Sequence, residues 1–296
     1  MSHLVTRRRA LIGAAATMPF IAAPALAVPP SGTKTPGEAK LRALEKKHGG
    51  RLGVFVRDTG NGAQLAHRAD ARLPMCSTFK FLLAAAVLKR VDDGQMRLDQ
   101  EIAYGTKDLL DYAPVAKQHV ESGRLSVGAL CGAAVVWSDN TAANLLLTQL
   151  GGPKAVTDYA RSLGDKVTRL DRMEPELNRV APGDPRDTTS AQAMAGDLEA
   201  ILTRNALSAV SRQRLEDWMV ASPTGRNRLR AGLPAGWRVG DKTGTGQGGS
   251  TNTVAIVRPP QKAPLVVAIY YTGSKAPLEA REAVHAEIAR LIAETF

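Results

Sequence analysis

The stretch that decides the fold is RLGVFVRDTGNGAQLAH, residues 51–67. Residues 51–58 alternate in polarity and are rich in valine, which predicts a β-strand. Residues 59–62 have the composition of a hairpin turn, and residues 64–67 predict the start of a returning strand. Comparable strand-like segments return near the C-terminus, at residues 238–242, 252–257 and 265–271. The simplest arrangement is one antiparallel sheet built from both ends of the chain.

The middle of the chain, about residues 78–220, has the spacing of amphipathic helices. The clearest helical segments are residues 79–91, 127–136, 142–150, 153–163 and 191–202. Residues 37–47 and 277–295 predict two further helices beside the strand-forming segments. We therefore expect an α+β fold, an α/β-α sandwich. In it, an antiparallel sheet from both chain ends is flanked by helices and carries an inserted all-helical domain.

One segment of the helical middle, residues 169–189, is charged, contains three prolines and has no period. It predicts a long ordered loop, and loops of this length inside a compact domain are usually functional. We expect residues 37–72 and 221–296 to form an α/β domain. Residues 73–220, including the 169–189 loop, would form the helical domain.

Residues 1–27 have the pattern of an export signal peptide. Arg7, Arg8 and Arg9 form a positive region, followed by a mildly apolar, alanine-rich stretch and the cleavage pattern Ala-Leu-Ala at 25–27. Paired arginines and modest hydrophobicity favour the twin-arginine route, with general secretory export as the alternative. Residues 28–36 contain proline and glycine and predict a linker. Either route predicts a periplasmic or secreted protein.

The composition is typical of a soluble globular protein, with 44% hydrophobic and 23% charged residues. No later apolar run is long enough to span a bilayer, so we expect no membrane association beyond export. The net charge of +11 falls to +8 without the three leader arginines. Aromatic residues make up only 4%, and no block of five like charges occurs, so a nucleic-acid partner is not expected. A monomer is the default expectation.

The metal- and sulfur-bearing residues are few. Cys76 and Cys131 could form one disulfide, but two buried free thiols are the interpretation that we favour. The five histidines are scattered, with no spacing typical of a zinc site. No glycine-rich phosphate loop follows a strand, so neither a metal nor another cofactor is expected.

The first motif with chemical meaning is Ser77-Thr78-Phe79-Lys80, at the start of an apolar helix. A spacing of three places Ser77 and Lys80 on one helix face, so the amine can reach the hydroxyl that it would activate. The helix N-terminus adds free backbone N–H groups that suit an oxyanion. Alone the motif is weak, because Ser77 could be a helix N-cap. Residues 31–34 form a second Ser-x-x-Lys, which has no function in the linker.

Two further motifs follow in order along the chain. Ser-Asp-Asn at residues 138–140 precedes a predicted helix, where simple capping is the alternative. Lys-Thr-Gly at residues 242–244 ends a predicted strand, where a lysine and hydroxyls can bind a carboxylate. The alternative there is a glycine turn with a solvated lysine. Each motif alone is unspecific, but the three in this order and on these elements are specific.

The three motifs are those of β-lactamases and penicillin-binding proteins, and the chain resembles that superfamily from about residue 37 to 296. Glu-Pro-Glu-Leu-Asn at residues 174–178 also resembles the class A β-lactamase pattern Glu-x-x-x-Asn. The resemblance implies a small-molecule β-lactam substrate. Hydrolysis of its amide bond through a serine acyl-enzyme would confer antibiotic resistance.

The resemblance also implies a role for each site residue. Ser77 would be the nucleophile, Ser138 would pass a proton to the lactam nitrogen, and either Lys80 or Glu174 would activate Ser77. Glu174 and Asn178 would hold the water that removes the acyl group. Backbone N–H groups of Ser77 and Thr245 would form the oxyanion hole. Substrate contacts are implied for Asn140, Lys242, Thr243, Gly244, Thr245, Tyr112 and Arg228.

At some positions this sequence differs from particular members of the family, which limits the substrate contacts and subtypes that the resemblance implies. Thr251 stands where some family members carry a substrate-binding arginine, and Arg228 matches an alternative source of that charge. Gly246 stands where certain carbapenem-hydrolysing members carry a cysteine bonded to the one before the serine, so that bridge is absent. Arg172 and Asp187 match positions that pair across the loop.

Two other functions remain open on the sequence alone. A D-alanyl-D-alanine peptidase or penicillin-binding protein would share the three motifs, although the pattern at residues 174–178 argues against it. A basic envelope protein that only holds anionic polymers would form no covalent adduct with penicillin, and its binding would be strongly salt-sensitive.

Overall fold

A computed structural model describes residues 1–3, 36–179, 181 and 183–296. Contacts divide the chain into two units, Met1–Thr33 and Lys34–Phe296, and the helices and strands of the described residues belong to the second unit. The predicted signal peptide and linker lie outside the described residues, apart from residues 1–3 and Pro36.

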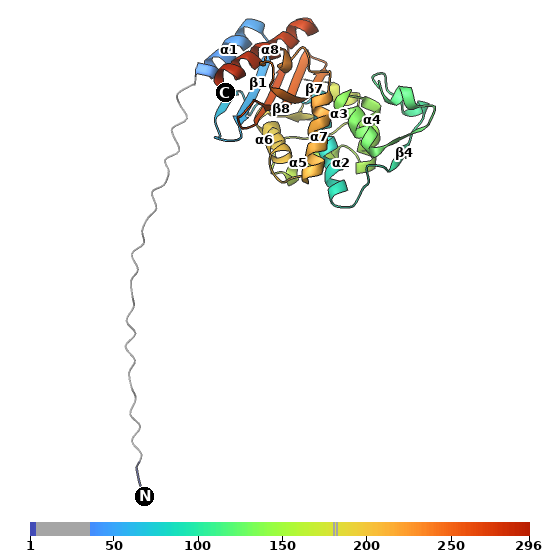
Figure 1. Ribbon diagram of the computed structural model, residues 1–296, viewed down its shortest axis with the longest axis vertical. Helices are drawn as coiled ribbons and strands as arrows, with labels where there is room; N and C mark the ends of the chain where they lie inside the picture. The colour runs from blue at the N-terminus through green and yellow to red at the C-terminus, as the bar shows by residue number, and fades with distance from the viewer. Residues whose placement is uncertain (4–35, 180, 182) are drawn as a thin grey trace. The chain divides into compact units, whose positions relative to one another are not determined.

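The central feature of the second unit is a five-stranded sheet in the order β2-β1-β9-β8-β7, with every neighbouring pair antiparallel (Figure 1). Its strands are β1 (Arg51–Asp58), β2 (Gln64–His67), β7 (Arg238–Gly246), β8 (Ser250–Arg258) and β9 (Leu265–Thr272). The β1–β9 pairing joins the two ends of the chain, with Arg51 opposite Thr272 and Asp58 opposite Leu265. The prediction of one antiparallel sheet from both chain ends is confirmed.

Helices cover both faces of this sheet (Figure 1). They are α1 (Pro36–His48), α2 (Phe79–Asp92), α3 (Val127–Val136), α4 (Asn140–Leu150), α5 (Lys154–Ser162), α6 (Ala191–Leu202), α7 (Ala209–Ala221) and α8 (Leu278–Thr295). Short elements are β3 (Leu73–Pro74), β4 (Glu101–Ala103), β5 (Arg124–Ser126), β6 (Thr188–Thr189), η1 (Cys76–Thr78), η2 (Thr106–Asp108), η3 (Ala116–His119), η4 (Glu176–Asn178) and η5 (Leu229–Ala231). The α+β prediction is therefore confirmed.

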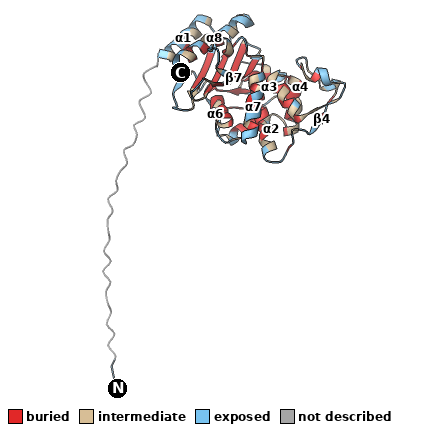
Figure 2. Ribbon diagram, in the orientation of Figure 1, coloured by how far each residue is buried: buried red, intermediate tan, exposed pale blue. Residues whose placement is uncertain are grey.

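Alternation along the strands gives the sheet a hydrophobic core on each face (Figure 2). Successive strand residues point to opposite faces. In β8, Ala255 and Val257 pack with α1 and α8, whereas Val254 and Ile256 join the larger core formed with the other helices. The larger core surrounds α2, whose residues 79–88 are all buried.

Helix α7 lies within the predicted helical middle but is not among the clearest helical segments of the sequence. Its core-facing side includes Glu216, which is buried and paired with Arg238 and Arg258 on β7 and β8. A charge at a buried position interrupts the apolar stripe that predicts a helix. Strand β7 also runs four residues beyond its predicted end, because Thr245 and Gly246 still pair with β8.

The loop at residues 169–189 is ordered by short elements of its own. It contains η4, and at its end β6 pairs with β3. Within the part of the chain that the structure describes, no helix is both long and apolar enough to cross a membrane.

Candidate active site

Ser77 lies in η1, one short turn before α2, rather than in the α-helix itself. It is 9% exposed, enough to be reached from the neighbouring cavity that it lines. Strand β7 approaches this turn closely: a Cβ on Gly244 would lie 2.8 Å from the carbonyl oxygen of Met75. A Cβ on Gly246 would lie 2.5 Å from Cys76 Sγ, so both glycines permit the contact between strand and turn.

Lys80 is fully buried, and its amine lies at the centre of the site. Its Nζ is 3.0 Å from Ser77 Oγ, 3.0 Å from Glu174 Oε1 and 2.5 Å from Asn140 Oδ1. Nζ also donates to the carbonyl of Ser138 at 2.8 Å. Burial lowers the pKa of Lys80, and the opposite charge of Glu174 partly offsets this effect. A lysine with a lowered pKa, in hydrogen-bond contact with a serine, can exchange a proton with the serine hydroxyl.

Glu174 reaches the same serine from the 169–189 loop. Its side chain is buried, with Oε1 3.3 Å from Ser77 Oγ and Oε2 accepting from Asn178 Nδ2 at 2.5 Å. The backbone of Glu174 is held by Asn144 of α4, whose Oδ1 accepts from its N–H at 2.9 Å and whose Nδ2 donates to its carbonyl at 2.8 Å. The loop is therefore fixed at the residue that faces Ser77.

Ser138 and Lys242 form the other side of the site. Lys242 is fully buried, and its Nζ donates to Ser138 Oγ at 3.0 Å. Burial lowers the pKa of Lys242 strongly, and the positive charge of Lys80 lowers it further. Asp139 caps α4 by accepting from the N–H of Ala142 at 2.8 Å, so the capping role considered from the sequence is filled by the middle residue of the Ser-Asp-Asn motif.

These residues open onto a cavity of about 440 Å³. Its lining residues are Ser77, Tyr112, Ser138, Asn140, Asn178, Thr224, Arg228, Thr243, Thr245 and Leu278. Arg228 is buried and donates to Thr245 Oγ1 at 2.7 Å and to the carbonyl of Gly244 at 2.9 Å. Tyr112 is 52% exposed at the rim. The wall formed by Thr224, Thr243, Thr245 and Arg228, with Lys242 buried behind it, suits a carboxylate.

Comparison with known proteins agrees with this geometry. The model of the β-lactamase enzyme family matches residues 36–296. An ancestral (GNCA) class A β-lactamase of known structure is 59% identical, with a TM-score of 0.86, over 88% of this chain and 100% of that one. The chain belongs to the class A β-lactamase family.

Relatives of known sequence are similar along nearly the same length. β-Lactamase AST-1 of Nocardia asteroides is 46% identical, over 89% of this chain and 85% of that protein. β-Lactamase CTX-M-97 of Escherichia coli is 45% identical, over 88% of this chain and 89% of that protein. The similarity therefore includes both the sheet and the helical middle.

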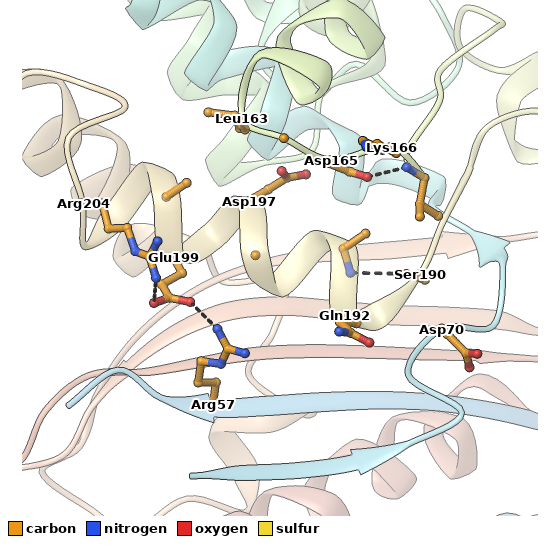
Figure 3. A pocket seen from close by; sticks show the side chains of 15 residues that line it. Arg57, Asp70, Leu163, Asp165, Lys166, Ser190, Gln192, Asp197, Glu199 and Arg204 are labelled. Carbon is orange, nitrogen blue, oxygen red and sulfur yellow. Dashed lines mark hydrogen bonds and ion pairs between the residues drawn. The ribbon is translucent and has the colours of Figure 1, made fainter. Parts of the chain in front are cut away.

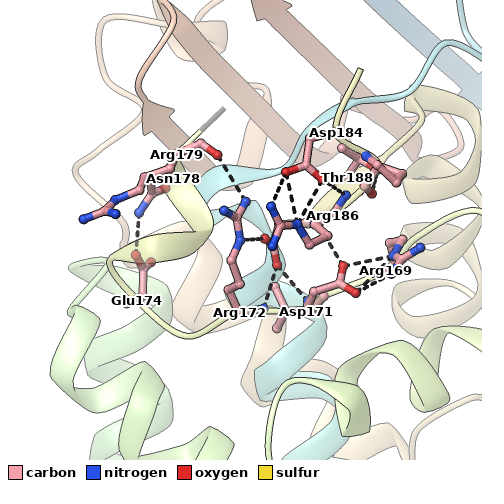
Figure 4. Close-up of polar contacts among 12 residues, drawn as sticks. Arg169, Asp171, Arg172, Glu174, Asn178, Arg179, Asp184, Arg186 and Thr188 are labelled. Atoms are coloured by element: carbon pink, nitrogen blue, oxygen red, sulfur yellow. Dashed lines mark hydrogen bonds and ion pairs between the residues drawn. The ribbon is translucent and has the colours of Figure 1, made fainter. Parts of the chain in front are cut away.

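In this β-lactamase-family chain the 169–189 loop is closed by ion pairs (Figure 4). Arg172 Nε donates to Asp187 Oδ2 at 2.5 Å, which is the pairing that the resemblance implied. Asp187 Oδ1 also accepts from the backbone N–H groups of Asp171 and Arg172, at 2.7 and 3.0 Å. The network holds together the two ends of the loop that presents Glu174.

Sequence reasoning missed three residues of the site: Asn144, and the cavity-lining Thr224 and Leu278. Asn144 lies four residues after Asn140, so helical spacing places it on the same face, and this was the signal that could have found it. Thr224 lines the cavity and accepts from Thr243 Oγ1 at 2.7 Å, but no motif marks it.

A second cavity, of about 520 Å³, lies beside α6 and contains none of the predicted site residues (Figure 3). Glu199 accepts there from Arg57 at 3.1 Å and from Arg204 at 2.6 Å. Asp165 and Asp197 also line it, and one oxygen of Asp197 is buried with no hydrogen-bond partner in the described chain. This cavity holds carboxyl groups but no arrangement of a nucleophile with a base.

The two cysteines, Cys76 and Cys131, are both free and buried, as favoured from the sequence. Burial raises the pKa of Cys76 to about 12, with the charge of Glu174 contributing, so it is not a competing nucleophile. Among the described residues, no group of three or more His, Cys, Asp or Glu side chains could hold a metal ion.

Proposed function

We propose that the chain hydrolyses the amide bond of β-lactam antibiotics through an acyl-enzyme on Ser77, and so confers antibiotic resistance. One observation carries the proposal: Ser77 Oγ lies 3.0 Å from Lys80 Nζ and 3.3 Å from Glu174 Oε1, beside a cavity lined by further motif residues. A hydroxyl between two groups that can take its proton is an activated nucleophile.

Acylation begins when Ser77 Oγ attacks the lactam carbonyl and loses its proton. Two routes are open: direct transfer to the neutral amine of Lys80, or transfer to Glu174 through a water. Burial lowers the pKa of Lys80, which makes loss of its proton easier, although the charge of Glu174 opposes this effect. The backbone N–H groups of Ser77 and Thr245 stabilise the oxyanion.

The lactam nitrogen must then receive a proton as its bond to the carbonyl carbon breaks. Ser138 is positioned to donate it, because its hydroxyl lies beside Lys242 Nζ and its carbonyl beside Lys80 Nζ. The substrate carboxylate is held by Lys242, Thr243, Thr245 and Arg228, and its amide side chain by Asn140. Gly244 contributes by letting β7 approach the turn that carries Ser77, and Tyr112 borders the cleft.

Deacylation needs a base for the attacking water, because an ester in a closed site hydrolyses slowly without one. Glu174, oriented by Asn178, supplies that base. This base distinguishes a β-lactamase, which hydrolyses the acyl-enzyme, from a penicillin-binding protein, whose acyl-enzyme is long-lived.

The test is intact-mass measurement of residues 28–296 mixed with benzylpenicillin, together with product analysis. Wild-type protein should release penicilloic acid with a transient adduct, whereas Glu174→Ala should accumulate a persistent adduct located on Ser77. Ser77→Ala is the matched control and should form no adduct. A long-lived adduct on wild-type protein would identify a penicillin-binding protein, and neither adduct nor product would exclude a serine acylase.

Several finer points belong to the same proposal. The chain would act as a monomer without cofactor, after export to the periplasm or medium by the twin-arginine route and cleavage after Ala27. The division into residues 37–72 with 221–296 and residues 73–220 also stays a prediction.

A further inference from the structure

A cavity of about 290 Å³ lies beneath the 169–189 loop, between the loop and the start of β1. It shares no lining residue with the catalytic cavity. Its charged lining residues are Arg51, Arg72, Arg172, Arg179, Arg186 and Asp184. Five arginines and a single acidic residue therefore line one small space.

Two of the five arginines are paired with carboxylates (Figure 4). Arg172 is paired with Asp187, and Arg186 with Asp184 at 2.7 Å. Arg72 donates only to neutral groups, the carbonyl of Val167 at 2.7 Å and Thr188 Oγ1 at 3.2 Å.

The remaining two arginines, Arg51 and Arg179, are exposed, and their side chains make no hydrogen bond or ion pair within the described chain. Three of the five arginines thus have no anionic partner among the described residues. Like charges gathered in a concavity repel one another and raise the local potential, which favours the capture of an anion.

The size and chemistry of the cavity define the class of ligand. A volume of about 290 Å³ suits a small ligand rather than a nucleic acid or a folded partner. Planar guanidinium forks match the oxygens of phosphate groups and bind them in a bidentate manner. We propose that this arginine pocket binds a small multivalent oxyanion carrying phosphate groups, with diphosphate as the probe.

Such a ligand would connect the loop to the sheet. Arg179 comes from the loop and follows Asn178 directly, whereas Arg51 begins β1. Arg172 Nη2 also donates to the carbonyl of Arg179 at 3.1 Å, so Arg179 is linked to the ion-paired part of the loop. An anion shared by Arg51, Arg72 and Arg179 should therefore reduce the motion of the loop that carries Glu174.

Binding is measured by calorimetric titration of sodium diphosphate into the protein, with sodium chloride at matched ionic strength as the reference for general screening. Wild-type protein should bind one diphosphate saturably. Arg51→Gln/Arg179→Gln should bind about tenfold more weakly or worse, because two charge-assisted contacts are lost. Neither arginine side chain holds another described residue, so the variant should fold, which circular dichroism checks.

The matched control is Arg42→Gln/Arg214→Gln, which removes the same charge from exposed positions outside the pocket. It should bind diphosphate as wild type does. Hydrogen exchange of residues 169–179 should slow on addition of diphosphate in wild type and the control, but not in the pocket variant. Equal affinity of the two double variants, or no saturable binding by wild type, would overturn the proposal.

The titration is repeated in Ser77→Ala, which cannot acylate. Unchanged binding there keeps the oxyanion proposal independent of the proposed acyl-enzyme chemistry. Loss of binding in Ser77→Ala would place diphosphate in the catalytic cavity and would also overturn the proposal.

Discussion

At the scale of single residues, two buried lysines form hydrogen bonds with Ser138. Lys80 Nζ donates to its carbonyl and Lys242 Nζ to its hydroxyl, at 2.8 and 3.0 Å. Burial lowers the pKa of both lysines, and Lys80 lowers that of Lys242 further. Both amines lie within hydrogen-bond distance of Ser138, so in the proposed mechanism they can support its transfer of a proton to the lactam nitrogen.

Asp197 is a residue whose ionisation should destabilise the protein. It is 2% exposed beside Asp165, and burial, with that like charge, raises its pKa well above 3.8. The folded chain therefore keeps a proton that the unfolded chain releases above pH 3.8. The stability from this group is complete below that pH and is lost as pH rises through the raised pKa. Asp197→Asn should thus be more stable than wild type at pH 8, by about 1–3 kcal/mol.

Urea unfolding of both proteins between pH 4 and 8 checks this expectation. The gain of Asp197→Asn over wild type should grow with pH. Asp70→Asn is the control, because Asp70 lines the same cavity but is exposed. A gain for Asp197→Asn that does not vary with pH would show that Asp197 is ionised throughout, contrary to the prediction.

At the scale of elements, the contact between the 169–189 loop and α4 rests on one side chain. Asn144 makes both hydrogen bonds to the backbone of Glu174. Asn144→Ala leaves a buried carbonyl and N–H without partners, which costs about 1–3 kcal/mol and releases the catalytic carboxylate from its position. Deacylation should slow by about tenfold or more, while acylation, which Lys80 can support, should change less.

Single-turnover kinetics with benzylpenicillin separate the two steps in Asn144→Ala. The acyl-enzyme should accumulate and be visible by intact mass. Thr148→Ala, one turn further along α4, removes an exposed hydroxyl that bonds only to the Asn144 carbonyl and should behave as wild type. Equal slowing of both steps in Asn144→Ala would show that the contact serves general stability instead.

At the scale of the whole molecule, what the sequence could predict depended on the range of the interaction. The contact between Ser77 and Lys80 follows from helical spacing alone. The approach of Glu174 to Ser77 spans 97 residues, and only the resemblance to a family predicted it. The arginine pocket had no signal, because Arg51 and Arg179 come from distant elements and belong to no motif. A buried charge, Glu216, kept helix α7 from standing out among the clearest helical segments.

A buried histidine, His285, connects the C-terminal helix α8 to strand β8 of the sheet. His285 is fully buried; its Nε2 lies 3.2 Å from the carbonyl of Thr251, and its Nδ1 lies 3.0 Å from Thr253 Oγ1. In the neutral ring, Nε2–H donates to the carbonyl while Nδ1 accepts from the hydroxyl. Burial, with the nearby charge of Arg228, lowers its pKa from 6.5 to about 3. The site therefore requires the neutral ring.

This requirement predicts acid lability. Between pH 6.5 and about 3 the unfolded chain binds a proton at His285 that the folded chain does not, so stability falls as pH decreases through that window. The loss approaches about 1.4 kcal/mol per pH unit from this group alone. His285→Gln should lose about 1 kcal/mol at pH 7 through poorer hydrogen bonding, but its stability should fall less steeply below pH 6.

Urea unfolding at pH 7, 6, 5 and 4 measures both slopes, with His119→Gln at an exposed position as the control. Parallel slopes for wild type and His285→Gln would mean that the strand–helix junction accepts the charged ring, and that acid sensitivity arises elsewhere.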